Sequence, residues 1–293
     1  MPEKALNTKL QLSREEMRSL GYRVVDALVD HFERLPGQPV SRVAGRKEME
    51  RLLREPLPDK GALPEDVVNQ AVRDVFGYMF HTQHRRFFAF VPSPSNFVSV
   101  MAEALSAGFN PFAGMWLEAA GPAQLELVVV DWLRQLCGLP ETAGGLFVSG
   151  GSMANLTALA VARHVRLAGN MQGAVLYTSE QTHSSVEKAA AVLGFAADQF
   201  RKLPTDEAFR LRTDSLAEAV AEDRRAGLRP FCVIASAGTT NTGAVDPLND
   251  LADFCAEHDL WLHVDGAYGA AAVLCEEGRR LLAGLERVDS LSL

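Results

Sequence analysis

The sequence predicts an α/β fold in which a mainly parallel sheet flanked by helices follows a helical amino-terminal segment. Two observations predict it. From residue 145 onward, apolar runs suited to buried strands alternate with stretches of helical periodicity, which is typical of a parallel sheet covered on both faces. Before that point, apolar residues recur mainly at helical spacing, and prolines separate the helical stretches. We expect a helical segment over residues 1–85 and a large ligand-binding domain over residues 86–293.

Helices are predicted in the amino-terminal part wherever apolar residues recur every three or four positions. Ser13 followed by Glu16 fits a capping box at the start of the first helix. The helices are expected at residues 13–35, 47–54, 65–79, 96–107 and 122–137. The proline-rich stretch over residues 36–64 forms a connector, and residues 87–94, rich in proline and phenylalanine, cannot form one regular element.

In the second part, strands and helices are expected to alternate. Strands are predicted at residues 146–149, 174–178, 231–235 and 261–264, and helices at residues 152–167, 184–193, 215–226 and 247–258. In a parallel sheet of this kind, ligands bind outside the carboxyl ends of the strands. The residues that follow each strand are therefore the candidates for chemistry.

Composition and charge exclude several classes of protein. The 293 residues are 47% hydrophobic and 23% charged, which is ordinary for a globular protein with a substantial core. A formal net charge of −8 leaves no basic stripe for nucleic acid. The start of the chain lacks the apolar core of a secretory signal, and no apolar run is long enough to cross a bilayer. The four scattered cysteines form no CxxC pair, so we expect reduced thiols in a cytoplasmic protein without nucleic-acid or membrane partners.

The first predicted strand is followed by a glycine turn that opens a helix. Gly150 and Gly151 would let the backbone approach an anion, and the free amides of the helix start together with the Ser152 hydroxyl would hold a phosphate. The turn is neither a Walker loop nor a GxGxxG motif. A tight turn with a serine cap remains the alternative interpretation.

The loops after the other strands supply an imidazole, hydroxyls and a carboxylate. His183 follows the second strand, and residues 236–243, rich in threonine, follow the third. Asp265 ends the fourth strand, on the same side as His263, and precedes Ala267. A carboxylate followed by small residues suits a flat ligand, with the acid facing a ring nitrogen. Capping residues and plain loops remain the alternative at each position, and His183, His263 and Asp265 could instead bind a metal in a hydrolase.

In their order along the chain, these motifs resemble one family. They are Gly-Gly-Ser at residues 150–152, Gln-Thr-His-Ser-Ser at 181–185, Gly-Thr-Thr at 238–240, His-Val-Asp-Gly-Ala-Tyr at 263–268 and, upstream, Arg-Phe-Phe-Ala-Phe at 86–90. The combination resembles the group II pyridoxal-phosphate-dependent amino-acid decarboxylases, which include the aromatic-L-amino-acid and glutamate decarboxylases. The resemblance implies fold type I, with the carboxy-terminal part of the chain forming the large cofactor-binding domain.

The resemblance also implies a role for each motif, with pyridoxal 5'-phosphate as the cofactor and no metal. The implied cofactor-binding residues are Gly150, Gly151 and Ser152 on the phosphate, His183 stacked on the ring, Thr240 and Asp246 in the polar surround, Asp265 on the pyridine nitrogen, and Ala267 near the ring. His183 and Asp265 are the implied catalytic residues. Phe90 and Pro92 are expected to shape the pocket for the substrate side chain, partly across a dimer interface.

The implied activity is decarboxylation of an L-amino acid. Residues 90–92 and 112–116 contain aromatic side chains and no Arg or Lys, which favours an aromatic or apolar substrate over glutamate. Another amino-acid lyase, an aldehyde synthase or a degenerate non-catalytic relative remains possible at this point. A cytoplasmic homodimer is expected, with Leu20, Val24 and Leu28 of the first helix in the interface, because an amphipathic helix needs a partner surface.

Two positions depart from the family pattern. Met153 stands where many relatives carry an acid. The Schiff-base lysine of the family is expected shortly after a stretch like residues 288–293, and no lysine follows Lys202 in this sequence. We therefore expect the sequence to be a truncated portion of a longer enzyme, incomplete at the carboxy-terminal end of its large domain and inactive by itself.

Overall fold

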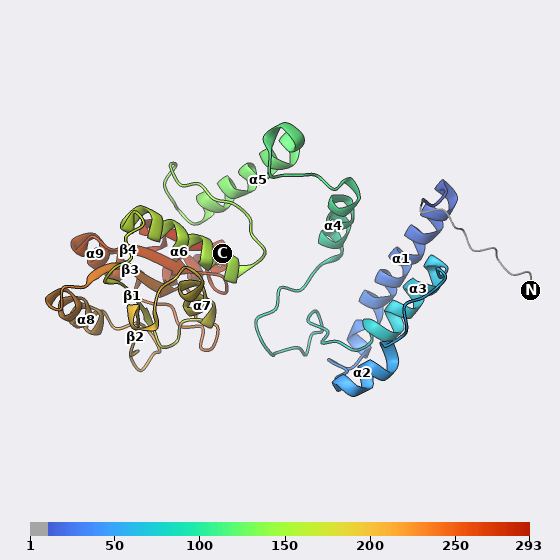
Figure 1. Ribbon diagram of the computed structural model, residues 1–293, viewed down its shortest axis with the longest axis horizontal. Coiled ribbons are helices and arrows are strands. Elements are labelled where there is room, and N and C mark those ends of the chain that lie inside the picture. Colours follow the sequence, from blue (N-terminus) through green and yellow to red (C-terminus); the bar gives the residue numbers. More distant parts are fainter. Residues whose placement is uncertain (1–10) are drawn as a thin grey trace, which may run out of the picture. The chain divides into compact units, whose positions relative to one another are not determined.

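The computed structural model describes residues 11–293, which form two compact units, residues 11–108 and residues 109–293 (Figure 1). Each unit is described by itself. The predicted domain boundary after residue 85 lies inside the first unit and stays a prediction, because compactness alone does not define a functional domain. Among the described residues, no helix is both long and apolar enough to cross a membrane.

The first unit is helical, as predicted. Its helices are α1 (Arg14–Arg34), α2 (Arg46–Leu53), α3 (Pro64–Gln70) and α4 (Phe97–Phe109), and α3 continues into one π-helical turn, Ala71–Val75. The predicted capping box is present, because Ser13 Oγ accepts from the Glu16 amide at 3.2 Å and Glu16 Oε2 accepts from the Ser13 amide at 2.7 Å. Helix α1 packs against α3, yet none of its residues is buried.

The second unit opens with a kinked helix. Helix α5 (Trp116–Leu136) starts earlier than the predicted residue 122, and its backbone leaves the helical region at Ala119. Pro122 follows that kink in the next turn, where its missing N–H group costs little. The predicted helix at residues 122–137 is therefore confirmed, with one further turn before the kink.

A five-stranded parallel sheet forms the centre of the second unit (Figure 1). Its strands are β1 (Ala174–Ser179), β2 (Phe200–Leu203), β3 (Arg229–Ser236), β4 (Trp261–Asp265) and β5 (Ser290–Ser292), in the spatial order β2-β1-β3-β4-β5. The three predicted strands that became β1, β3 and β4 are the central ones. They are buried on both faces, which is why their apolar runs were recognisable.

The predicted strand at residues 146–149 is wrong. Residues 143–148 have no regular structure, and Leu146 and Phe147 are 61% and 55% exposed. The Phe147 amide donates to Glu126 Oε1 of α5 at 2.7 Å rather than to a neighbouring strand. An apolar run becomes a strand only when another strand pairs with it, and no strand in the described part of the chain does so.

Two strands were missed in the sequence, and both lie at edges of the sheet. Strand β2 is only 4 residues long and carries Arg201 and Lys202, while β5 is 3 residues long. Short and charged edge strands lack the apolar run that identifies a central strand. Their pairing depends on a partner distant in sequence.

Helices cover both faces of the sheet. Helices α6 (Gly151–Leu167) and α7 (Ser184–Val192) pack on one face, and α8 (Thr213–Arg225) and α9 (Leu248–His258) on the other (Figure 1). A further short helix, α10 (Glu276–Leu281), follows β4. Successive residues of a strand point to opposite faces, so Leu176 joins the core under α6 and α7 while Tyr177 joins the core under α8 and α9. This architecture is the α/β fold that the sequence predicted.

The strand order brings the chemistry-bearing loops to one edge of the sheet. The chain runs from β1 to β2 on one side and then crosses to β3 on the other side of β1. Because all strands are parallel, the segments that follow β1, β3 and β4 leave the sheet at the same edge. Such a crossing is where parallel sheets bind ligands.

Candidate functional site

A buried carboxylate with hydrogen-bond donors around it lies at the end of β4. Asp265 is 9% exposed. Its Oδ1 accepts from the Ala267 amide at 3.2 Å, and its Oδ2 accepts from Asn155 Nδ2 at 2.9 Å. Ser292 Oγ also lies 3.2 Å from Oδ1, but its one hydrogen is shared with Asn155 Oδ1, which is closer at 2.8 Å. A carboxylate offers about four acceptor positions. At least one position on Asp265 is therefore left for a ligand.

The start of α6 offers unpartnered backbone donors. Gly150 precedes the helix with φ +117°, a conformation that favours glycine, and its carbonyl accepts from the Met153 and Ala154 amides. Within the described chain, the amides of Gly151 and Ser152 donate to no backbone acceptor. Free amides at a helix start, reinforced by the helix dipole, bind anions. The phosphate-binding role of Gly150, Gly151 and Ser152 stays a prediction.

The same helix start lies directly against the loop that follows β4. A Cβ atom added to Gly151 would lie 2.9 Å from the Cβ of Ala267, closer than two carbon atoms can approach without a shift. The predicted phosphate-binding and ring-facing residues are thus neighbours in space. Asn155 lies one turn further along α6, about 6 Å along the axis at about 1.5 Å per residue.

His183 caps the start of α7. Its Nδ1 accepts from the Ser185 amide at 3.3 Å and lies 2.8 Å from Ser185 Oγ. Ser185 Oγ in turn accepts from Asn155 Nδ2 at 3.0 Å, so two short links join His183 to the residue that holds Asp265. The imidazole is exposed at the sheet edge. It therefore acts as a cap through one nitrogen and remains accessible to a ligand.

Thr240 lies on the surface of the loop after β3. In the part of the chain that the structure describes, its exposed hydroxyl has no hydrogen-bond partner. The neighbouring Thr239 is buried instead, with its Oγ1 2.5 Å from Thr242 Oγ1. The role predicted for Thr240 beside the cofactor stays a prediction.

Asp246 anchors two backbone segments. It is 2% exposed, and its two oxygens accept from the amides of Leu211 and Ser236, each at 2.7 Å. Burial raises the pKa of the Asp246 carboxyl from 3.8 to about 6. Because Ser236 lies beside Asp265 in the sheet, Asp246 supports the strand end next to the site. Its membership of the cofactor's polar surround stays a prediction.

We expect Asp246 to make the free energy of unfolding fall as the pH rises from about 4 to about 6. A carboxyl whose pKa is raised in the folded state binds more protons there than in the unfolded chain over this range, so a higher pH favours unfolding. A rise from 3.8 to about 6 corresponds to about 3 kcal/mol, at about 1.4 kcal/mol per pKa unit.

The measurement compares urea unfolding of the wild type with that of Asp246→Asn across this pH range. His263 contributes a slope of the opposite sign, since burial lowers its pKa, but this contribution cancels in the difference between the two proteins. The exposed Asp253→Asn is measured alongside as a control for the loss of a surface carboxylate. A difference between the wild type and Asp246→Asn that does not vary with pH would contradict the prediction.

Phe90 and Pro92, the residues expected at the substrate side chain, belong to the first unit. Phe90 is 79% exposed, has a left-handed backbone with φ +61°, and its ring centroid lies 6.0 Å from that of Phe80. The residues that surround Asp265 all belong to the second unit. The substrate-binding role of Phe90 and Pro92 therefore stays a prediction.

Asn155, Ser185 and Ser292 are the site residues that sequence reasoning missed. One signal could have found Asn155: it shares the buried face of α6 with Leu159 and Ala162, at the spacing of apolar core positions. A polar residue on such a face needs buried partners. Ser185 belongs to the Gln-Thr-His-Ser-Ser motif at residues 181–185 but was given no role there, and no comparable local signal marks Ser292.

The metal alternative does not fit the geometry of His263. This residue is fully buried, with Nε2 3.1 Å from Asn155 Oδ1 and Nδ1 3.0 Å from Ser290 Oγ. Both nitrogens are thus engaged within the protein, and neither offers a lone pair to an ion. Among residues 11–293, no three His, Cys, Asp or Glu side chains are grouped so that they could hold a metal.

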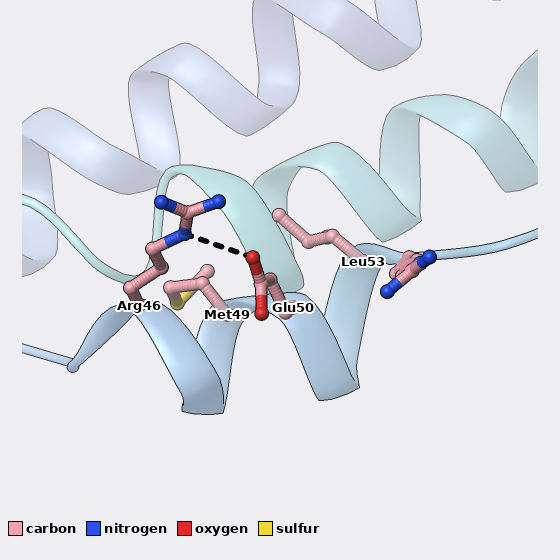
Figure 2. Close-up of a pocket in the computed structure, with 5 residues that line it drawn as sticks. Arg46, Met49, Glu50 and Leu53 are labelled. Carbon is pink, nitrogen blue, oxygen red and sulfur yellow. Dashed lines mark hydrogen bonds and ion pairs between the residues drawn. The ribbon is translucent and has the colours of Figure 1, made fainter.

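A surface hollow elsewhere lacks these features. It lies in the first unit, has a volume of about 590 Å³, and is lined by α2 residues and Arg54. Figure 2 shows Met49 and Leu53 extending from α2 toward a neighbouring helix, while Arg46 is paired with Glu50 at 2.8 Å on the same helix. The acid that lines this hollow, Glu50, is paired with Arg46, and the hollow is open to solvent. The sheet edge at Asp265 is the stronger candidate.

Comparison with protein families matches residues 47–293 to the pyridoxal-dependent decarboxylase conserved domain. The chain belongs to this family. The match confirms the resemblance that the sequence motifs indicated, and it covers the α6 start, the loop at His183 and the end of β4. It extends upstream into the helical first unit as well.

Individual relatives of this decarboxylase family agree in fold. Aromatic-L-amino-acid decarboxylase of Bacillus atrophaeus is 48% identical over 288 residues, which are 98% of this chain and 60% of that protein. The structure of tryptophan decarboxylase from Catharanthus roseus in complex with L-tryptophan matches with a TM-score of 0.91 at 29% identity, over 97% of this chain and 63% of that one. The structure of 4-hydroxyphenylacetaldehyde synthase from Rhodiola rosea matches with a TM-score of 0.89 at 30% identity, over 96% and 62%. The chain thus spans about 60% of the length of these relatives.

Proposed function

We propose that the full-length protein is a pyridoxal-phosphate-dependent decarboxylase of an aromatic L-amino acid. One observation carries the proposal: Asp265, a buried carboxylate with an acceptor position left, lies next to a helix start whose first two amides have no acceptor in the described chain. A pyridine ring with a phosphate arm needs both features, an anion at its ring nitrogen and donors at its phosphate. Family membership and the names of the relatives support the same cofactor.

In this proposal each predicted residue keeps its role toward the cofactor. The residues are Gly150, Gly151 and Ser152 at the phosphate, His183 on the ring face, Thr240 and Asp246 in the polar surround, Asp265 at the ring nitrogen, and Ala267 against the ring. The exposed position of His183 at the sheet edge and the small side chain of Ala267 beside Gly151 support this arrangement.

Asp265 would keep the ring nitrogen protonated. A carboxylate beside a titratable nitrogen raises its pKa by about 1–3 units, each worth about 1.4 kcal/mol. When bound, pyridoxal phosphate accepts the electron pair that remains after carbon dioxide leaves an amino acid. The contribution of this chain is to hold an ionised acceptor against the ring and to anchor the phosphate.

An aromatic substrate is the choice that the relatives and the composition favour. The Bacillus atrophaeus relative is an aromatic-L-amino-acid decarboxylase, and the Catharanthus roseus relative is a tryptophan decarboxylase. Exposed Phe90, with Pro92 close by, offers an apolar surface for an aromatic side chain, and no Arg or Lys occurs over residues 90–92 or 112–116. A cytoplasmic location belongs to the same proposal.

Aldehyde synthesis is the second candidate, because a structural relative is a 4-hydroxyphenylacetaldehyde synthase. The test incubates the full-length protein and pyridoxal phosphate with phenylalanine, tyrosine, tryptophan and glutamate, and it measures carbon dioxide, amine and aldehyde. We expect equal amounts of amine and carbon dioxide from an aromatic substrate. Aldehyde in place of amine would favour the second candidate, and turnover of glutamate alone would contradict the aromatic assignment.

A homodimer is part of the proposal. The support is that α1, a helix of 21 residues, has no buried residue, and that Met17 and Val24 on one face are 57% and 38% exposed. Leu20 and Leu28, also predicted in the interface, are half-buried within the unit itself. Substituting them would therefore disturb the unit as well as the interface.

We expect Met17→Asp combined with Val24→Asp to dissociate the dimer of the full-length protein. Burial of each side chain contributes roughly 1.5–3 kcal/mol, and a buried unpaired aspartate adds a further cost. Ser19→Asp, on the opposite face of α1, is the control and should sediment as the wild type does. A double variant that sediments as a dimer of wild-type affinity would place this face outside the interface.

A further inference from the structure

The Asn155 side chain fills all four of its hydrogen-bonding positions and is 1% exposed. Its Nδ2 donates to Asp265 Oδ2 at 2.9 Å and to Ser185 Oγ at 3.0 Å. Its Oδ1 accepts from Ser292 Oγ at 2.8 Å and lies 3.1 Å from His263 Nε2. An amide has two donor hydrogens and two acceptor positions, so none is spare. Asn155 therefore joins α6 to α7, β4 and β5 at the candidate site.

The charge of Asp265 decides which way round this amide lies. A carboxylate only accepts, so the Asn155 atom beside it is the nitrogen, because the reverse arrangement would set two oxygens 2.9 Å apart. The amide oxygen then faces His263 Nε2, which must carry the hydrogen of the ring. His263 Nδ1 consequently accepts from Ser290 Oγ at 3.0 Å, and that hydroxyl accepts from Trp261 Nε1 at 2.8 Å.

The orientation of the Asn155 amide also determines which nitrogen of His183 carries the ring hydrogen. Ser185 Oγ accepts from Asn155, so its own hydrogen is free to point at His183 Nδ1, 2.8 Å away. The Ser185 amide also donates to that nitrogen. His183 Nδ1 is therefore an acceptor without a hydrogen, and the ring hydrogen sits on Nε2.

We infer that Asn155 is a positioning residue of the proposed decarboxylase: it orients the Asp265 carboxylate toward the cofactor nitrogen and sets which nitrogen of His263 carries the hydrogen. The part that concerns the cofactor rests on the proposed function, whereas the hydrogen-bond pattern stands without it. Loss of this one side chain removes the donor to Asp265 Oδ2 and leaves His263 Nε2 with no acceptor. Burial lowers the pKa of His263, which keeps its ring neutral and gives it a single hydrogen to place.

The first experiment reads the hydrogen position directly. The full-length protein is labelled with nitrogen-15 in histidine, and the His263 signals, assigned by their loss in His263→Gln, distinguish Nε2–H from Nδ1–H. We expect Nε2–H in the wild type. In Asn155→Leu we expect the hydrogen to move to Nδ1, where the Ser290 carbonyl at 3.2 Å is the remaining acceptor. Ser292→Ala is the matched control, since it removes another bond to Asn155 without turning the amide, and it should retain Nε2–H.

A second variant, Asn155→Asp, tests the inference if the Asn155→Leu protein does not fold. In Asn155→Asp a carboxyl of the same shape faces Asp265, and two carboxyls at this distance share one proton. The ionisable groups bonded into the network are Asp265 and His263 from β4 and His183 before α7. We expect one new titration, in the neutral range, in the visible absorbance of bound pyridoxal phosphate. We also expect kcat to fall at least about tenfold with little change in KM. A fall of this size corresponds to the free energy of one lost hydrogen bond to a charged group.

The outcomes separate this inference from the proposed function. A His263 hydrogen that stays on Nε2 in Asn155→Leu, or an absorbance titration in Asn155→Asp identical to that of the wild type, would overturn the inference. A purely structural role would lower the stability of both variants without moving either signal. If the wild type bound no pyridoxal phosphate while the His263 hydrogen still moved in Asn155→Leu, the proposed function would fail and the hydrogen-bond role of Asn155 would hold.

Discussion

Asp265→Asn is expected to lower the turnover of the full-length protein by about tenfold to a thousandfold. The carboxylate favours the protonated ring nitrogen by about 1–3 pKa units, at about 1.4 kcal/mol per unit. A ring without that proton is a poorer acceptor for the electron pair, so the same free energy appears in the barrier. Asparagine matches the shape of aspartate and removes its charge, and the effect is therefore electrostatic. Asp265→Ala should lose at least as much.

The measurement is the initial rate of carbon dioxide release, together with the visible absorbance of the bound cofactor. Asp253→Asn serves as the matched control, because the Asp253 side chain is 71% exposed on α9, where it pairs with Arg287. That variant should keep wild-type turnover. If Asp265→Asn retained more than about a tenth of the activity, the loss would be below about 1.4 kcal/mol, and Asp265 would not be the partner of the ring nitrogen.

Gly151→Val is expected to weaken the binding of pyridoxal phosphate by about tenfold to a hundredfold. A branched side chain would obstruct the free amides at the start of α6, and hydrogen bonds to a charged phosphate contribute about 1.5–3 kcal/mol each. The new Cβ would also lie 2.9 Å from that of Ala267, so the helix start would be pushed away from the loop after β4. Titration of the protein with cofactor, followed by absorbance, measures the loss.

Two further variants separate the phosphate contact from the packing effect. Ser152→Ala removes an exposed hydroxyl and creates no clash, so we expect a smaller loss of cofactor affinity with unchanged thermal stability. Met153→Leu changes the next residue, which is 42% exposed, and should bind cofactor as the wild type does. Unchanged affinity in both Gly151→Val and Ser152→Ala would remove the turn from the site.

Much of the fold was predictable because its signals are local. Strands β1, β3 and β4 are buried on both faces and carry unbroken apolar runs, and the helices between them show helical periodicity. The edge strand β2, with Arg201 and Lys202 among its residues, has no such signature. The opposite error occurred at residues 146–149, where an apolar run exists but no strand of the described chain pairs with it.

The site residues also divide into those that a local sequence signal marks and those whose partners are distant in sequence. Gly150, Gly151 and His183 could be found because each stands at the start of a helix that follows an expected strand, and Asp265 because it ends one. For Asn155 the sequence offered only its position on the buried face of α6, because its partners are far away in sequence. Ser185, His263, Asp265 and Ser292 are separated from it by 30, 108, 110 and 137 positions.

The sequence by itself determined the α/β fold class, the decarboxylase family and the loops that carry the candidate chemistry, since periodicity, strand ends and motifs are properties of neighbouring residues. Only the tertiary structure decided that the Gly151 turn touches Ala267 and that one buried amide, Asn155, holds Asp265 and His263. The physical reason is that a hydrogen bond acts over about 3 Å and requires a defined direction. Only the folded sheet brings such distant residues within that range.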